Sequence, residues 1–179
     1  SPKGLARLGK IKPASLPLVK GKPRIGACVA NPQKFVAIGL NYSDHAAESG
    51  LTVPPEPIIF TKHTSCIVGP NDDVTIPPKS KKSDWEVELG VVIGTRAKNI
   101  KKKDAMAHVA GYCVVNDISE RAFQIERSGQ WTKGKCYDTF GPVGPWLVTA
   151  DEVKDPQKLH LWLELNGKRV QDGSTATMV

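Results

Sequence analysis

The segment Asp84-Trp-Glu-Val-Glu-Leu-Gly-Val-Val-Ile93 places two carboxylates inside an otherwise hydrophobic run. In an extended strand alternate side chains share a face, so Glu86 and Glu88 point the same way, roughly 7 Å apart. The apolar residues from Leu89 to Ile93 predict a strand that is buried on both faces. Neighbouring anions that enter a core are costly without a cation, which indicates a metal ion. A solvated face of a half-exposed strand gives the same pattern, and this alternative stays open.

A second apolar run, Gly111-Tyr-Cys-Val-Val-Asn-Asp117, also ends on a carboxylate. If the two strands lie side by side, Glu86, Glu88 and Asp117 converge on one point. Three oxygen ligands suit Mg²⁺, Mn²⁺ or Ca²⁺ better than zinc. The pattern therefore indicates three metal ligands. An Asp in an ordinary turn after a strand gives the same sequence pattern and stays open as the alternative for Asp117.

The rest of the sequence predicts a mainly β fold with short helices. With 179 residues the chain is long enough for one domain with a real core, and 16 glycines and 14 prolines indicate many turns. The alternating run Leu159–Leu165 meets Asn166-Gly167, the strongest short hairpin signal. Short helices are expected at 43–49, 101–110 and 119–127.

The basic charge is confined to the N-terminal part of the chain. Lys and Arg number 25 against 18 Asp and Glu, and seven of these cations lie in residues 1–24, which contain no acid. We expect residues 1–30 to be a basic linker or the remnant of an N-terminal region, and residues 31–179 to be the catalytic domain. Because the body is neutral and the arm has little aromatic content for stacking, we expect no nucleic-acid partner.

No apolar stretch approaches the roughly 18 residues of a membrane span, so no membrane partner is expected. The N-terminus lacks the apolar core of a secretion signal. The four cysteines are widely separated, with no Cys-x-x-Cys pair, which argues against a cysteine zinc site and favours reduced thiols. These features together predict a cytoplasmic protein.

Further groups could take part in catalysis. His45 and Glu48 stand three residues apart, and on a helix this spacing puts both on one face, where a carboxylate can orient an imidazole as a general base for water. An inert surface pair is the alternative.

Three cationic side chains that could contact a substrate follow Asp117 in the sequence: Arg121, Lys133 and Lys135. Arg121 lies four residues after Asp117, with Gln124 three further on, and Arg is the natural fork for a substrate carboxylate. An ordinary surface arginine is the alternative. Either Lys133 or Lys135 could neutralise an enolate, and spacing does not choose between them.

Four motifs in the same order resemble the fumarylacetoacetate hydrolase family, from about Phe35 to the C-terminus. The closest subgroup resembles bacterial diketo-deoxy-fuconate hydrolases and ureidoglycolate lyases. The motifs are Gly39-Leu-Asn-Tyr-Ser-Asp-His45 with Glu48, Asp84-Trp-Glu-Val-Glu-Leu89, Asn116-Asp-Ile-Ser-Glu-Arg-Ala-Phe-Gln124, and Lys135-Cys-Tyr-Asp-Thr-Phe-Gly-Pro142.

The resemblance implies a mixed β-sandwich roll around one Mg²⁺ or Mn²⁺, usually in a homodimer. It implies that Lys135, rather than Lys133, is the catalytic lysine. The roles that it implies for other residues are metal ligands at Glu86, Glu88 and Asp117, a water-activating pair at His45 and Glu48, and substrate contacts at Tyr42, Arg121, Gln124 and Thr139. Family members continue past the Asn166-Gly167 hairpin, so the expected fold is a roll that is truncated at its C-terminal end.

The reaction implied by the resemblance is hydrolysis of a carbon–carbon bond in a 2,4-diketo acid, such as an acylpyruvate or a diketo-deoxy sugar acid. The expected products are pyruvate and a carboxylic acid. Oxaloacetate decarboxylation and ureidoglycolate cleavage would use the same site and stay open as alternatives. A non-catalytic nucleic-acid or anion binder acting through the basic arm is a more distant alternative.

Overall fold

A four-stranded mixed sheet forms the centre of the computed structural model, which describes residues 2–179. Its order is β3-β8-β6-β5; β5 and β8 are antiparallel to β6, whereas β3 is parallel to β8. The strands are β3 (Ile67–Val68), β5 (Val87–Ile93), β6 (Val109–Asn116) and β8 (Gly141–Thr149). This arrangement of short strands confirms the predicted mainly β, mixed architecture.

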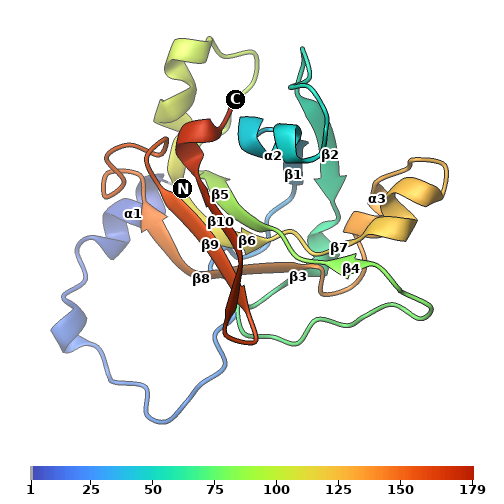
Figure 1. Ribbon diagram of the computed structural model, residues 1–179. Helices are drawn as coiled ribbons and strands as arrows, with labels where there is room; N and C mark the ends of the chain where they lie inside the picture. The colour runs from blue at the N-terminus through green and yellow to red at the C-terminus, as the bar shows by residue number, and fades with distance from the viewer. Residues whose placement is uncertain (1) are drawn as a thin grey trace.

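Three antiparallel strand pairs surround this sheet. They are β1 (Phe35–Gly39) with β2 (Ile58–Lys62), β4 (Ser83–Asp84) with β7 (Ser119–Glu120), and β9 (His160–Leu165) with β10 (Lys168–Ser174). The β9–β10 hairpin, red in Figure 1, runs beside β5, and Val87 N donates to Gln171 Oε1 at 2.8 Å. Asn166 and Gly167 have φ values of 52° and 78°, as the predicted tight hairpin turn requires.

The helices are all short. The α-helices are α1 (Pro2–Leu8), α2 (Ser43–Glu48) and α3 (Thr132–Lys135). The 3₁₀ segments are η1 (Pro13–Ser15), η2 (Thr64–Cys66), η3 (Lys102–His108) and η5 (Thr175–Thr177), and η4 (Ala122–Glu126) is a π-helix. The helix expected at 43–49 is confirmed, whereas those expected at 101–110 and 119–127 are only a 3₁₀ segment and a π-helical turn that follows β7.

The prediction that β5 is buried on both faces was wrong. Val91 and Ile93 are 49% and 59% exposed. β5 is the last strand of its sheet, and in residues 2–179 nothing covers that side of it fully. An apolar run indicates that a strand can be buried, but the burial itself depends on whether a distant segment packs on each face.

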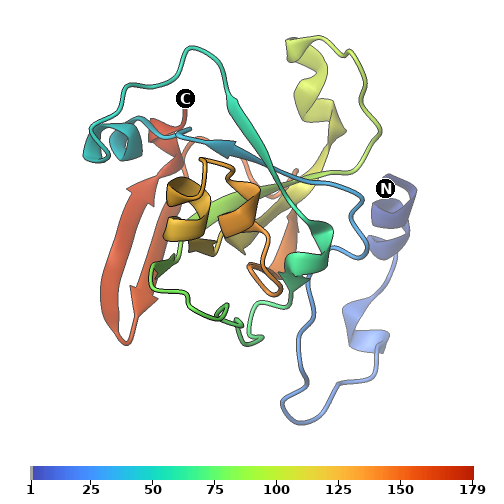
Figure 2. The ribbon, with the colours of Figure 1, turned by 90° about the vertical axis from the view of Figure 1, so that its right-hand side faces the viewer.

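The N-terminal segment loops away from the strands in both views (Figures 1 and 2). An ion pair between Arg24 and Asp72, 2.5 Å apart, ties its end to the body. Within residues 2–179 no helix combines the length and apolarity needed to span a membrane. All four cysteines are free thiols.

Candidate active site

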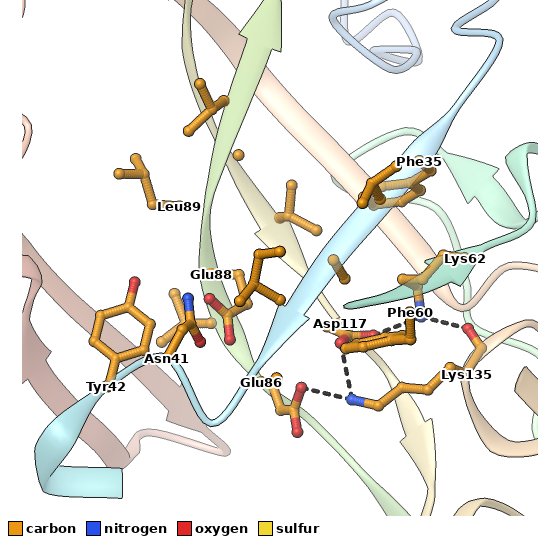
Figure 3. Close-up of a pocket in the computed structure, with 18 of the residues that line it drawn as sticks. Phe35, Asn41, Tyr42, Phe60, Lys62, Glu86, Glu88, Leu89, Asp117 and Lys135 are labelled. Carbon is orange, nitrogen blue, oxygen red and sulfur yellow. Dashed lines mark hydrogen bonds and ion pairs between the residues drawn. The ribbon is translucent and has the colours of Figure 1, made fainter. Parts of the chain in front are cut away.

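The pairing of β5 with β6 brings the two carboxylate-bearing segments together. Val87 lies opposite Asn116, and Asp117 N donates to Glu86 O at 2.9 Å. The side-by-side arrangement expected from the sequence is therefore confirmed. Glu86, Glu88 and Asp117 all line one large pocket (Figure 3).

Cations and carboxylates alternate along one wall of this pocket. Lys135 Nζ lies 2.8 Å from both Glu86 Oε2 and Asp117 Oδ2. Lys62 Nζ lies 2.6 Å from the other oxygen of Asp117, and Arg121 Nη2 lies 2.6 Å from the other oxygen of Glu86. We call the series Arg121–Glu86–Lys135–Asp117–Lys62 the ion chain. Burial favours a raised pKa for Asp117, but the two lysines outweigh it and lower that pKa.

Glu88 stands outside the ion chain. No hydrogen bond to its carboxylate is found among residues 2–179. Burial raises the pKa of Glu88 to about 8; the negative charges of Glu86 and Asp117 add to this, and Lys135 opposes it only in part. Tyr42 Oη, in the same pocket, is buried and has no hydrogen-bond partner in the part of the chain described. The pocket thus holds one buried polar atom without a partner, Tyr42 Oη, and one half-buried carboxyl group, that of Glu88, which receives no hydrogen bond from the described residues.

Sequence reasoning missed Lys62. Its side chain is only 2% exposed, and its ammonium donates to Asp117, to Ile118 O at 3.2 Å and to Lys135 O. A signal was present: along β2, Ile58, Phe60 and Lys62 occupy alternate positions and therefore share the inward face. A lysine on an apolar strand face indicates a buried anion nearby.

The short helix α3 brings Lys135 to the pocket because it packs closely on its neighbours. A Cβ atom on Gly134 would lie 2.4 Å from Glu120 O, so only glycine permits this approach. At the start of α3, the Trp131 ring meets Phe60 edge-on, with centroids 5.3 Å apart. Lys135 Nζ lies 5.2 Å from the centroid of the same Phe60 ring.

The predicted water-activating pair lies on α2 at the pocket wall. His45 and Glu48 both line the pocket and are exposed. Within residues 2–179 no hydrogen bond joins their side chains, so the pair is near the site but is not hydrogen-bonded. The turn that leads into α2 contains Leu40 with φ of 50°, a left-handed conformation that is unusual for this residue type.

The three other predicted substrate contacts differ in position. Arg121 and Gln124 line the pocket, and Arg121 Nη1 donates to Gln124 Oε1 at 3.1 Å. Arg121 also donates through Nε to Asp84 Oδ2 at 2.9 Å, so most of its fork is engaged within the protein. Thr139 is not among the pocket-lining residues; its hydroxyl accepts from Thr75 N at 2.7 Å and so joins two loops.

Glu86, Glu88 and Asp117 have the oxygen donors that a hard divalent cation prefers, although their carboxylates are not arranged around a metal position in this structure. As they stand, no three Asp, Glu, His or Cys side chains in residues 2–179 form a group that could hold a metal ion. The ammonium of Lys135 occupies the space between Glu86 and Asp117 instead. The donors are nevertheless all carboxylate oxygens, and the half-buried Glu88 makes no ion pair with another described residue.

Comparisons with known proteins identify the family. The model of the fumarylacetoacetate (FAA) hydrolase C-terminal region matches residues 34–179. A protein of Burkholderia cenocepacia strain HI2424, provisionally named a hydrolase, is 65% identical over 176 residues. That match covers 98% of this chain but only 62% of the relative, so the chain spans less than two thirds of the relative's length.

Two solved structures from Mycobacterium smegmatis have the same fold. A protein provisionally named HpcE has a TM-score of 0.83 and 42% identity, over 98% of this chain and 61% of that one. A 5-carboxymethyl-2-hydroxymuconate delta-isomerase has a TM-score of 0.72 and 38% identity, over 81% of this chain and 56% of that one. These names include both hydrolase and isomerase and do not select the subgroup that the motifs resemble. By sequence, motif order and fold, this chain belongs to the fumarylacetoacetate hydrolase family.

Proposed function

We propose that the protein is a metal-dependent hydrolase that cleaves a carbon–carbon bond of a 2,4-diketo acid and releases pyruvate and a carboxylic acid. The observation that carries this proposal is the ion chain beside Glu88, a half-buried glutamate of the same pocket that has no ion pair or hydrogen bond among the described residues. In a purely structural ion network each carboxylate has a cation or a hydrogen-bond donor beside it. Glu88 has neither, and a divalent cation would give its carboxylate a partner.

A divalent cation held by Glu86, Glu88 and Asp117 would supply Lewis-acid polarisation of the 2-keto oxygen and the substrate carboxylate. The side chains around the pocket have complementary roles. His45, oriented by Glu48, takes a proton from water, and the resulting hydroxide adds to the distal carbonyl carbon. The bond between this carbon and the neighbouring methylene then breaks.

The bonding electrons go to the methylene carbon and give the enolate of pyruvate. Lys135, at the inner end of the pocket, balances this negative charge, and protonation of the carbon completes the reaction. Arg121 and Gln124 lie where they can orient the substrate carboxylate, provided that part of the Arg121 fork turns away from Asp84.

The test is pyruvate release from acylpyruvates by the purified protein with Mg²⁺ or Mn²⁺. Glu88→Gln is the informative variant because the Glu88 carboxylate makes no hydrogen bond among the described residues and its replacement breaks no internal contact. We expect about a hundredfold loss of turnover and of metal affinity in this variant. Glu152→Gln, at an exposed position, is the matched control and should behave like the wild type. Unchanged turnover in Glu88→Gln would overturn the metal assignment.

Isomerisation of an unsaturated 2-keto diacid is the second candidate reaction. Two observations favour it: the relative named as a delta-isomerase, and the absence of a His45–Glu48 hydrogen bond in residues 2–179. A double-bond shift needs the enolate but no activated water. With 5-carboxymethyl-2-hydroxymuconate as substrate, an absorbance change without pyruvate or carboxylic acid release would select the isomerase. Release of both products from an acylpyruvate would select the hydrolase.

A further inference from the structure

We propose that the ammonium of Lys135 is an exchangeable internal cation, which holds Glu86 and Asp117 together until a divalent cation replaces it and turns it toward the substrate. This inference rests on the proposed function, because it assumes that these carboxylates bind a metal ion. It adds a coupling that the proposed reaction does not require: metal binding and the exposure of the catalytic lysine would be a single event.

The three cations of the ion chain differ in how they are held. Lys62 donates to Asp117 and to two main-chain carbonyls, so its ammonium is fixed by the backbone. Arg121 is held by Asp84 and Gln124 in addition to Glu86. The ammonium of Lys135, in contrast, donates to no described residue besides Glu86 and Asp117, the two carboxylates that a metal would take over.

When a divalent cation displaces Lys135, each of the two hydrogen bonds that the ammonium loses is replaced by an interaction between a carboxylate and the incoming ion. A divalent cation between Glu86 and Asp117 repels the ammonium, since both would occupy the same space with the same sign of charge. The metal ion would also repel Lys62 and Arg121, but Lys62 stays hydrogen-bonded to main-chain carbonyls and Arg121 to side chains outside the metal site. Of the three, Lys135 is the one that must move.

A place for the displaced ammonium already exists. Lys135 Nζ lies 5.2 Å from the centroid of Phe60, within the range of a cation–π contact, and Phe60 lines the pocket (Figure 3). A small movement of the flexible end of the lysine over this ring removes it from the carboxylates. The amine then faces the space that a substrate would fill, with no carboxylate left to neutralise it.

The first experiment compares Mg²⁺ and Mn²⁺ affinities by titration calorimetry. Lys135→Met should bind either ion about tenfold more tightly than the wild type, because two charge-assisted hydrogen bonds no longer compete with the metal. Lys133→Met is the matched control: this residue is on the same helix, is exposed and donates only to Arg127 O at 3.2 Å. Its affinity should equal that of the wild type.

The second experiment follows Lys135 in the unmodified protein and does not depend on the folding of a variant. Reductive methylation, read by peptide mass spectrometry, measures the accessibility of each lysine with and without Mg²⁺. We expect Mg²⁺ to increase methylation of Lys135 at least severalfold, while the backbone-anchored Lys62 stays protected.

The outcomes separate the two proposals. If the wild type binds metal but Lys135→Met binds it no more tightly, or if Mg²⁺ leaves Lys135 protected, the exchange is wrong and the metal site stands. If neither the wild type nor Lys135→Met binds a divalent ion, the proposed function fails and the exchange fails with it. Tighter binding by Lys135→Met together with exposure of Lys135 by Mg²⁺ supports the exchange.

Discussion

Two glutamates of this protein, Glu120 and Glu88, have opposite surroundings. Glu120, on β7, is 0% exposed, and its carboxylate accepts hydrogen bonds from Ser80, Ser83 and the backbone amides of Lys82 and Ala122. Glu88, on β5, is half-buried in the pocket, and no donor reaches its carboxyl group among the described residues. The contrast separates a carboxylate that the fold satisfies with hydrogen bonds from a carboxyl group that the fold leaves without a donor.

The pKa values of the two carboxyl groups follow this difference. Burial favours a raised pKa for Glu120, but the hydrogen bonds from Ser80, Lys82 and Ala122 outweigh it and lower the pKa. For Glu88 burial acts without such compensation, and Glu86 and Asp117 add to it, so the pKa rises to about 8. A carboxyl group in a pocket that receives no hydrogen bond and whose pKa is raised is a better indicator of ligand binding than a buried charge as such.

The largest expected effect is at Glu120. In Glu120→Gln an NH₂ group replaces one carboxylate oxygen. This buried donor then faces backbone N–H groups, which are donors themselves and cannot accept its hydrogen bond. We expect Glu120→Gln to lower the free energy of unfolding by about 3 kcal/mol. Urea denaturation followed by circular dichroism measures this loss. A loss below about 0.5 kcal/mol would show that the hydrogen bonds to Glu120 do not stabilise the fold.

A smaller effect on the free energy of unfolding is expected at Gly134, where α3 packs against Glu120 of β7. Its Cβ in an alanine variant would lie 2.4 Å from Glu120 O and 2.6 Å from Gln124 N, so α3 must shift away from β7. We expect Gly134→Ala to cost about 2 kcal/mol of unfolding free energy. Because Lys135 follows directly on α3, the shift should also weaken its ion pairs. Gly173→Ala, at a position with open space and no positive φ, is the control for a glycine replaced without a steric clash.

The sequence was sufficient to predict the features that depend on local periodicity. Alternation places Glu86 and Glu88 on one side of their strand, and Asn166-Gly167 specifies the hairpin that follows β9. The pairing of β5 with β6, on which the convergence of Glu86, Glu88 and Asp117 depends, was a hypothesis that the sequence left open. The first two inferences need only a few neighbouring residues.

The features that the sequence did not predict depend on contacts between distant segments. Lys62 and Lys135 come from β2 and α3, and their positions around Asp117 are set by packing of Phe60, Trp131 and Gly134. Period-2 spacing shows that Lys62 lies on the inward face of β2, but neither that spacing nor helical spacing shows that Asp117 is its partner. The exposure of Val91 also depends on distant segments, because the residues of a strand do not show whether another segment covers its second face.

The change in stability that contrasts most with the one at Glu120 is expected at Glu88. Its native pKa of about 8 lies above the ordinary value of 4.5, so the native state binds the proton more tightly than the unfolded state. In EDTA, the free energy of unfolding of the wild type should therefore fall as the pH rises from about 4.5 to about 8. Glu88→Gln should lack this fall, and at pH 8.5 it should be more stable than the wild type.

A divalent cation should reverse the order of the two proteins. With saturating Mg²⁺ the wild type gains the free energy of metal binding, whereas Glu88→Gln gains little, so the wild type becomes the more stable one. Urea denaturation at pH 5 and pH 8.5, with EDTA or with Mg²⁺, gives the four values required for each protein. A Glu88→Gln variant less stable than the wild type in EDTA at pH 8.5 would mean that Glu88 stabilises the fold as Glu120 does. The distinction between the two glutamates would then be lost, because both would be anions that the fold uses.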